Sequence, residues 1–291
     1  DPRVEQRENS YPPIDEQYRD LVQRILRVGQ EKSDPQGVGN LSIHGYDFTF
    51  DLSTGKFPLL GLRNLGRGEW RAMRGELAWI MSGSTNVADL QKYGVHIWDQ
   101  WVEPTKKDFP EYPEGELGPV YGKQWRMFEA GGPEPVDQLM EAMRLLRENP
   151  DSRRIVISVW NPYEINNVFI SPCVRYLQFH HAQGRLGLTA IQRSADVPVG
   201  VPFDIAEYAL FLMMAAKVNN MHPALLRYTL VDAHIYKDQI PMMEDLARRQ
   251  STQEPSVIIH SSPESILDFK PEHFELVDYN PNPPMKIPVA L

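Results

Sequence analysis

Apolar side chains recur at intervals of three and four residues in several stretches of the chain, which is the pattern of helices that bury one face. This pattern predicts helices over residues 14–28, 68–81 and 136–148. Residues 205–217 are strongly apolar apart from Glu207, so we expect a core helix there. Hydrophobic periodicity therefore predicts much of the helical framework.

Alternation of apolar and polar residues predicts strands over residues 155–160, 176–181 and 186–192. Residues 40–52 alternate in the same way and contain Gly45. Because glycine is common in turns, this stretch is predicted to form two strands that turn near Gly45.

Predicted helices and strands do not alternate regularly, which favours an α+β or irregular α/β fold over a doubly wound sheet. Residues 232–249 begin extended and become helical, whereas residues 98–122 are rich in Pro, Gly and aromatic residues without clear periodicity. Long stretches of this second kind are usually functional loops. No segment has the composition of a linker, so we expect residues 1–291 to form a single domain.

Composition and charge exclude several classes of protein. Hydrophobic residues make up 42% of the chain, enough for a large core, but no apolar run of about 18 residues predicts a membrane span. The formal net charge of −9 would repel a nucleic-acid backbone, so a small anionic ligand fits better. A single cysteine and a charged N-terminus without an apolar signal predict a cytoplasmic protein with neither membrane nor nucleic acid as partner.

Cys173 is the single cysteine of the chain and follows Pro172. A lone thiol forms no internal disulfide and supplies no cysteine cluster for zinc, so we expect no metal site and interpret Cys173 as a candidate nucleophile. The fixed φ of Pro172 would hold the thiol in place at a strand edge. The alternative is a buried cysteine that packs as a small hydrophobic residue.

Other polar and aromatic residues are candidates for an anion site with acid–base groups. Arg153, Arg154, Arg193 and Ser194 flank the predicted cysteine strand, and guanidinium groups bind phosphate through paired hydrogen bonds. Taken singly, an arginine is more often a solvated or salt-bridged surface residue.

Further candidates each have a structural alternative. Trp98 and Trp101 form either an aromatic wall or core contacts, and Asp204 is either a functional carboxylate or a helix cap. Glu76 and His234 are either acid–base groups or satisfied core residues.

Taken together, these segments resemble the thymidylate synthase superfamily over most of the chain. The common order of the matching stretches makes the resemblance specific. They are NLSI (40–43), GEL (75–77), IWDQW (97–101), LGPVYGKQWR (117–126), DSRR (151–154), PC (172–173), QRSADV (192–197), GVPFDIA (200–206), DAHIY (232–236) and KIPVAL (286–291).

The resemblance implies a three-layer α+β catalytic domain whose large mixed β-sheet forms a homodimer interface. It also implies one-carbon transfer from 5,10-methylenetetrahydrofolate to C5 of a pyrimidine nucleotide monophosphate. A pyrimidine C5 is too weak a nucleophile for this reaction until a thiolate adds at C6, and a neighbouring arginine stabilises such a thiolate.

By the same resemblance, individual residues have expected roles. Cys173 would attack C6, Glu76 would manage protons through water, and Tyr121 would assist proton removal at C5, with Asp196 and Asp204 as further catalytic residues. The residues expected to bind substrate are Arg193, Ser194 and Gln192, Arg153 and Arg154 from the partner subunit, Asp204 at the base, and His234 and Tyr236 at the sugar. The residues expected to enclose the folate are Trp98, Trp101, Asp196 and Ala290.

Asp204 occupies the position where thymidylate synthases have an asparagine that reads uracil. Cytosine presents a 4-amino donor and an N3 acceptor, the reverse of uracil. A carboxyl group accepts from the amine and shares a proton with N3, so Asp204 predicts a cytosine reader. A buried polar group left unpaired costs about 1–3 kcal/mol, enough for discrimination of roughly tenfold or more.

Two further departures affect the nucleotide site. Val174 stands where synthases carry a histidine near the pyrimidine O4, which agrees with a changed base. Pro35 stands where the family has a mobile phosphate-binding arginine, so Arg63 or another residue would have to replace it.

These observations predict a cytidylate 5-hydroxymethylase that acts on CMP or dCMP with water as the terminal nucleophile. The alternatives within the family are a cytidylate C5-methyltransferase and thymidylate synthase. From other classes, a nucleic-acid-binding regulator is disfavoured by the acidic charge. A cysteine hydrolase is disfavoured because no Cys–His signature is visible.

Overall fold

A computed structural model describes residues 11–34 and 37–289 of the chain. Pro35 and Ala290 lie outside the described residues, and so does the other end of the predicted C-terminal motif, Leu291. None of the described helices is both long and apolar enough to cross a lipid bilayer.

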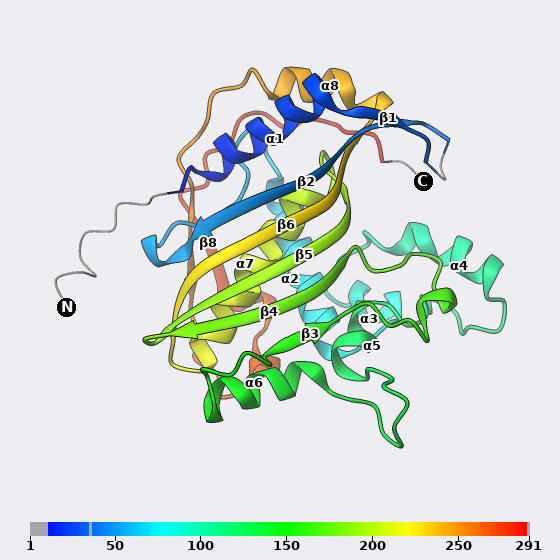
Figure 1. Ribbon diagram of the computed structural model, residues 1–291, viewed down its shortest axis with the longest axis vertical. Coiled ribbons are helices and arrows are strands. Elements are labelled where there is room, and N and C mark those ends of the chain that lie inside the picture. Colours follow the sequence, from blue (N-terminus) through cyan, green and yellow to red (C-terminus); the bar gives the residue numbers. More distant parts are fainter. Residues whose placement is uncertain (1–10, 35–36, 290–291) are drawn as a thin grey trace.

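A six-stranded sheet forms the centre of the described chain, with the order β1-β2-β6-β5-β4-β3 (Figure 1). β5 and β6 are parallel, and every other neighbouring pair is antiparallel, so the predicted mixed sheet is confirmed. The strands are β1 (Gln30–Lys32), β2 (Asn40–Asp51), β3 (Val156–Ser158), β4 (Val174–Ala182), β5 (Arg185–Asp196) and β6 (His222–Tyr236). A separate ribbon pairs β7 (Ser256–Ile259) with β8 (Phe274–Val277).

The predicted turn at Gly45 is wrong, because β2 is one continuous strand. It pairs with β6 on both sides of this glycine, with His44 opposite Asp232 and Tyr46 opposite Leu230. Gly45 has a φ of 83°, a left-handed conformation that glycine adopts without strain. The long partner strand supplies hydrogen bonds along all of β2, which outweighs the local preference of glycine for a turn.

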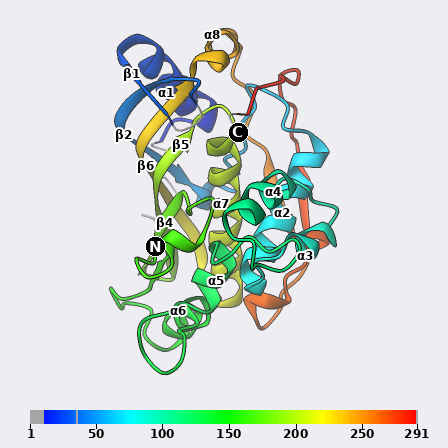
Figure 2. The ribbon, with the colours of Figure 1, turned by 90° about the vertical axis from the view of Figure 1, so that its right-hand side faces the viewer.

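Helices cover one face of the sheet in successive layers, as Figure 2 shows for α7 and α2. The predicted helices are confirmed at α1 (Ile14–Val28), α2 (Gly66–Ser82), α6 (Gln138–Glu148) and α7 (Gly200–Val218), although α7 begins before the predicted start. The shorter helices are α3 (Val87–Gln91), α4 (Val102–Asp108), α5 (Tyr121–Arg126) and α8 (Ile240–Leu246). The stretch 98–122, predicted to be a loop, therefore contains α4.

The core lies between α7 and the sheet. Leu188 of β5 and Leu226 of β6 point toward α7 and are at most 1% exposed, as is Phe211 of the helix. Full burial of such a side chain contributes about 1.5–3 kcal/mol. Because α7 is packed on both sides, it lacks a polar face, which explains its almost uninterrupted apolar sequence.

The sequence prediction missed most of β6. Only its last residues, 232–236, were expected to be extended, whereas the strand begins at His222. The helix predicted to follow is limited to α8 and a preceding 3₁₀ turn, Lys237–Gln239.

Candidate active site

Cys173 lies directly before β4, at the point where the chain enters the sheet. The Arg193 backbone N–H donates a hydrogen bond to the Cys173 carbonyl oxygen over 2.8 Å. The pairing of β4 with β5 is irregular between Val174 and Tyr176. These two features hold the cysteine beside the C-terminal half of β5, which carries the predicted phosphate-binding residues.

The Arg193 side chain wraps around the segment that precedes the cysteine. Its Nε–H donates to the Pro172 carbonyl oxygen over 3.0 Å, and its Nη2 donates to that of Ser171 over 2.8 Å. The guanidinium group also lies over the Trp160 ring, 5.3 Å from the ring centroid. A positive charge is thereby placed next to the thiol, as predicted for an activated nucleophile.

Two opposing influences act on the thiol. Burial, followed by the nearby charge of Asp204, raises the pKa of Cys173 to about 11, while Arg193 and Tyr121 lower it. A group with this pKa is almost entirely protonated at neutral pH. Formation of the thiolate therefore has to be coupled to an event in the site such as binding of substrate.

Tyr121 is the first residue of α5, and its hydroxyl meets the cysteine backbone. The hydroxyl oxygen accepts hydrogen bonds from the N–H groups of Cys173, at 2.7 Å, and Val174, at 3.3 Å. Its own proton therefore points away from these backbone N–H groups, and the hydroxyl also hydrogen-bonds to the Cys173 thiol, whose pKa it lowers. Burial raises the pKa of Tyr121 well above its ordinary value, which keeps that proton in place.

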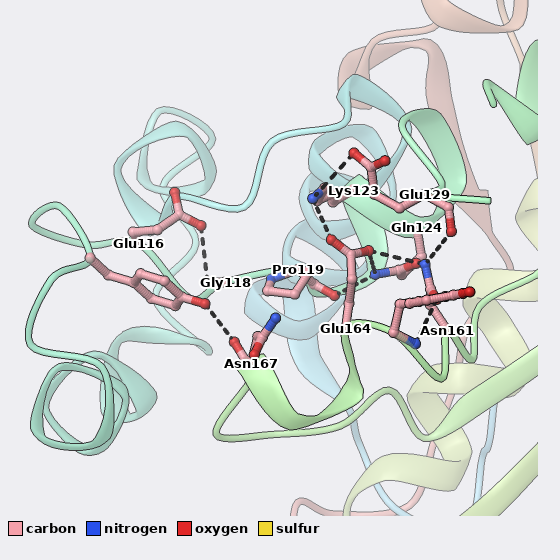
Figure 3. A network of polar contacts seen from close by, with 11 residues as sticks. Glu116, Gly118, Pro119, Lys123, Gln124, Glu129, Asn161, Glu164 and Asn167 are labelled. Carbon is pink, nitrogen blue, oxygen red and sulfur yellow. Dashed lines mark hydrogen bonds and ion pairs between the residues drawn. The ribbon is translucent and has the colours of Figure 1, made fainter. Parts of the chain in front are cut away.

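A buried polar network fixes the segment that carries Tyr121 (Figure 3). Glu164 forms an ion pair with Lys123 and accepts hydrogen bonds from Gln124, at 3.0 Å, and Asn161, at 3.1 Å. The Gln124 amide also donates to the Pro119 carbonyl oxygen over 2.9 Å. The network joins α5 to residues 161–167, which lead to the cysteine, so Tyr121 and Cys173 are held by one rigid unit.

We expect Tyr121→Phe to lower kcat by roughly 100-fold with little change in KM, because it leaves two backbone N–H groups unpaired and removes a proton-transfer group. Steady-state kinetics would measure both constants. Tyr112→Phe is a matched control, since the Tyr112 hydroxyl donates to the Asn167 carbonyl oxygen, at 2.8 Å, outside the site. Equal losses in the two variants would contradict a specific role for Tyr121.

Glu76 projects from α2 toward the same site. One of its carboxyl oxygens accepts a hydrogen bond of 2.6 Å from the indole Nε1–H of Trp98. Burial raises the pKa of Glu76 to about 7, and the Trp98 bond opposes the rise. A carboxyl group poised near neutrality exchanges protons readily at physiological pH. Trp98 also packs edge-on against Tyr121, with ring centroids 6.2 Å apart.

Asp204 lies within α7, four residues after its first residue, Gly200. The alternative interpretation of Asp204 as the helix cap is therefore wrong. Burial, followed by the charges of Glu76 and then Asp196, raises the pKa of Asp204 to about 8, while Gln192 lowers it. Gln192 is itself buried and is oriented by Tyr228, whose hydroxyl donates to the Gln192 side-chain oxygen over 2.8 Å. At neutral pH Asp204 is consequently a neutral carboxyl group with a proton to donate.

The raised carboxyl pKa values predict that stability falls as the pH rises. Asp204 titrates near 8 in the folded chain but at its ordinary value of 3.8 when unfolded, so its favourable contribution is complete below 3.8 and is lost as the pH passes 8. We expect Asp204→Asn to reduce the loss of unfolding free energy between pH 5 and pH 9 by about 4 kcal/mol. Urea unfolding at fixed protein concentration would test this, and parallel pH profiles of variant and parent would contradict it.

Asp196, His234 and Tyr236 meet at the ends of β5 and β6. Asp196 lies opposite His234 in the parallel pairing. Burial raises the pKa of Asp196 to about 6, and the His234 charge lowers it. The His234 and Tyr236 rings pack edge to face at 5.2 Å. The sheet thus brings together the residues predicted for the sugar and one predicted for the folate.

The C-terminal segment reaches this corner through Gln239. The Gln239 amide Nε2 donates to the Pro288 carbonyl oxygen over 2.9 Å and lies 3.3 Å from an Asp196 carboxyl oxygen. The described part of the predicted tail therefore lies beside Asp196. Trp101, half-buried, packs against Phe169 with ring centroids 6.1 Å apart.

Arg153 and Arg154 do not reach Cys173 of their own chain. They precede β3, and the Phe179 N–H donates to the Ile155 carbonyl oxygen over 3.0 Å, so these arginines lie beside the far end of β4. At about 3.3 Å per residue, this end of β4 is roughly 20 Å from Cys173. Both side chains are exposed, and neither guanidinium group bonds to another residue of the described chain.

Arg63 is buried, and its Nη2 donates to the Pro198 carbonyl oxygen over 2.8 Å. Its Nε has no hydrogen-bond partner within the described residues. This position is next to the Asp196 corner, and a role in binding phosphate stays a prediction. Val174 is 1% exposed and packs in the core.

The family assignment rests on a match that covers nearly the whole chain. Residues 16–291 match the family model described as thymidylate synthase. The chain belongs to the thymidylate synthase family. A member of this family is a one-carbon transferase that acts on a pyrimidine nucleotide monophosphate with methylenetetrahydrofolate as co-substrate. Members of the thymidylate synthase family fold as dimers, and the α+β architecture described above is that of the family.

One cavity has a lining that does not include the cysteine. It has a volume of about 700 Å³, lies at the C-terminal end of α2 and is lined by Trp79, Ser84, Asp89 and Glu116. Groups of His, Cys, Asp or Glu arranged to hold a metal ion do not occur within residues 11–34 and 37–289.

Sequence reasoning missed several residues that shape the site. Trp160, which supports Arg193, is the last residue of the strand predicted over residues 155–160 and carries no distinguishing spacing. Tyr228 lies in the part of β6 that was not predicted. Glu207 was noted only as an interruption of an apolar helix, although a charge within such a helix was a usable signal.

Proposed function

We propose that this enzyme is a cytidylate 5-hydroxymethylase. The observation that carries the proposal is Asp204, a half-buried carboxyl group whose pKa of about 8 favours the protonated form at neutral pH. Its carbonyl oxygen is suited to accept from the cytosine 4-amino group, and its O–H is suited to donate to N3. Uracil presents an acceptor and a donor at these positions, so the carboxyl proton would have to sit on the other oxygen, and an ionised carboxylate could not donate to O4.

Cys173 would begin the reaction by adding its sulfur to C6 of the ring, with the ring electrons moving toward C5. The C5 carbanion would then take the methylene group of methylenetetrahydrofolate and form a carbon–carbon bond, while the methylene–N10 bond breaks and N10 takes up a proton. Loss of the C5 proton and cleavage of the methylene–N5 bond would release tetrahydrofolate, with N5 taking up a proton. These steps leave an electrophilic methylene group on a ring that is still bound to Cys173.

Water would end the reaction. Its oxygen would bond to the methylene carbon while one of its protons passes to ionised Glu76, whose pKa of about 7 suits a base near neutrality. The ring electrons would restore the C5–C6 double bond and expel the Cys173 sulfur as thiolate. The overall reaction consumes water and releases tetrahydrofolate without net oxidation.

The main alternative is a cytidylate C5-methyltransferase, in which tetrahydrofolate supplies hydride and leaves as dihydrofolate. The tail segment at Pro288 and the packed indoles of Trp98 and Trp101 favour this alternative, because a closed, dry site suits hydride transfer. Mass spectrometry of products from CMP, dCMP and dUMP, with absorbance monitoring of dihydrofolate, separates the possibilities. We expect hydroxymethylcytidylate to form without dihydrofolate. A preference for dUMP would instead support thymidylate synthase as the function.

The site would be completed in a homodimer by Arg153 and Arg154 of the partner subunit. Two observations support this proposal: these side chains are exposed far from their own Cys173, and the face of β4, β5 and β6 opposite α7 is not crossed by a described helix (Figure 1). An exposed pair of guanidinium groups suits an anionic phosphate in a neighbouring site.

Subunit complementation tests the shared site. We expect Cys173→Ala and the double variant Arg153→Ala/Arg154→Ala to be inactive alone. After mixing and subunit exchange, the heterodimer regains one site with both an intact cysteine and intact arginines. Random exchange should restore about a quarter of the parent activity. Mixtures that stay inactive despite proven exchange would show that each chain uses its own arginines.

A further inference from the structure

Glu207 is a buried carboxyl group for which the steps described above have no use. It lies on α7 and is 5% exposed, yet its side chain forms no hydrogen bond or ion pair with any residue that the structure describes. Burying a polar group without a partner costs free energy. A ligand or water is therefore needed to satisfy this carboxyl group.

The carboxyl group borders space that water can reach. Among the described residues, several polar atoms are both fully enclosed and without a hydrogen-bond partner, for example in Arg63 and Trp125. The Glu207 oxygens are not among these fully enclosed atoms. An unpaired oxygen of Glu207 that is not fully enclosed must touch a probe-sized space. Because the residue as a whole is 5% exposed, that space lies inside the protein or in its cleft.

Glu207 faces the two carboxyl groups already assigned to the reaction. It follows Asp204 by three residues, so the two side chains lie on one face of α7, about one helical turn apart. α2, which carries Glu76, packs against α7 (Figure 2). After burial, the charges of Glu76 and Asp204 further raise the pKa of Glu207 well above its ordinary value, which favours its neutral form.

This placement matches the chemistry of the last step. In cytosine the 4-amino group is on C4, the ring atom next to C5. Asp204 is proposed to bind this amine, so Glu207, one helical turn further along α7, can face the C5 substituent. A neutral carboxyl group accepts a hydrogen bond from water through its carbonyl oxygen. The second hydrogen of that water would then point to ionised Glu76, which leaves an oxygen lone pair free to attack carbon.

We propose that Glu207 binds, together with Glu76, the water that attacks the C5 methylene group. This inference rests on the proposed hydroxymethylase function and assigns its terminal nucleophile. Oxygen–carbon bond formation, proton transfer to Glu76 and expulsion of the Cys173 thiolate proceed as described above. Glu207 neither gains nor loses a proton, and its contribution is to orient the water.

The test separates the steps before water attack from water attack itself. Release of tritium from [5-³H]CMP reports thiolate addition, one-carbon transfer and loss of the C5 proton. Trapping of the methylene group by added 2-mercaptoethanol reports its lifetime, because a thiol competes with water for the same carbon. Products would be counted by mass spectrometry in the parent and in Glu207→Gln, Glu207→Leu and Glu207→Met.

In the two apolar variants we expect the ratio of thioether to hydroxymethyl product to rise about tenfold, the effect of one lost hydrogen bond to the reacting water. Tritium release should stay within about twofold of the parent. Glu207→Gln retains a carbonyl acceptor and should keep the ratio close to the parent value. Having two apolar variants of different shape guards against a folding defect in one of them.

An unchanged product ratio in both apolar variants would overturn the inference, as would a parallel fall in tritium release and product, which indicates a structural role. Failure of the proposed function is recognised separately, in the parent enzyme. If the parent forms dihydrofolate and no hydroxymethyl product, both proposals fall. If the parent hydroxymethylates cytidylate but the ratio of thioether to hydroxymethyl product is the same in the Glu207 variants, only the inference about Glu207 is wrong.

Discussion

Replacing Cys173 with alanine is expected to abolish one-carbon transfer while leaving the fold and nucleotide binding in place. The loss should be at least about 10⁴-fold, because no other group can form the bond that activates C5. The small alanine side chain fits the site, and the Tyr121 hydroxyl still accepts a hydrogen bond from the backbone N–H of residue 173. Steady-state product formation and equilibrium binding of CMP would measure the two properties.

A covalent adduct is the direct readout for this prediction. A 5-fluorocytidylate carries fluorine where the C5 proton must leave, so the reaction should stop with the nucleotide and folate joined to Cys173. Intact-protein mass spectrometry should detect this ternary adduct in the parent and not in Cys173→Ala. Turnover that survives in Cys173→Ala, or an adduct at another residue, would contradict the nucleophile assignment.

Asp204→Asn is expected to move base preference from cytosine toward uracil. The amide cannot share a proton with cytosine N3 in the way the neutral carboxyl group does, but it can donate to uracil O4 and accept from N3–H. Loss of one matched hydrogen bond and gain of another should change the ratio of kcat/KM values for cytidylate and uridylate by roughly 100-fold. Competition between CMP and UMP, and between the two deoxynucleotides, would measure the ratio directly.

Asp196→Asn is the matched control, since it makes the same chemical change at another half-buried carboxyl group of the site. It lies beside His234 and Gln239, among the residues predicted for the sugar rather than for the base. We expect it to lower activity on both bases and to leave their ratio nearly unchanged. If Asp204→Asn keeps the parent preference, or if both variants alter it equally, Asp204 is not the base reader.

The electrostatics of the site explain why a carboxyl group can serve as a hydrogen-bond donor there. Asp204, Glu76 and Glu207 come from two packed helices and share one poorly hydrated space, so each carboxylate charge raises the cost of the next. Carboxyl groups of the site, Asp204 among them, therefore keep their protons at neutral pH. This property distinguishes the proposed cytosine reading from simple attraction of an amine by a negative charge.

Local spacing predicted the helical framework closely. α1 occupies the predicted residues 14–28, and α2 and α6 match within a few positions. These helices bury one face each, so their periodicity is visible in sequence. β6 was largely missed because it is a central strand that turns its Leu226, Tyr228 and Leu230 side chains into the core and carries mixed polar residues on its other face.

The candidate site was predictable only in part. The motifs pointed to Cys173, Tyr121, Glu76 and Asp204, and the fold brings the segments that carry them together. Whether Asp204 caps its helix was undecidable from spacing, since the answer depends on where α7 begins. The position of Arg153 and Arg154 at the far end of β4 depends on strand register, which is set by pairing between distant segments.

The sequence by itself determined the mixed α+β framework, the single thiol available for covalent chemistry and membership of the thymidylate synthase family. The tertiary structure decided that β2 is continuous, that the paired arginines lie far from their own cysteine, and that Asp204 is protonated at neutral pH. The physical reason is that periodicity and motifs are local properties of the chain. Burial and the interaction between charges arise only when α2, α7 and the sheet pack against one another.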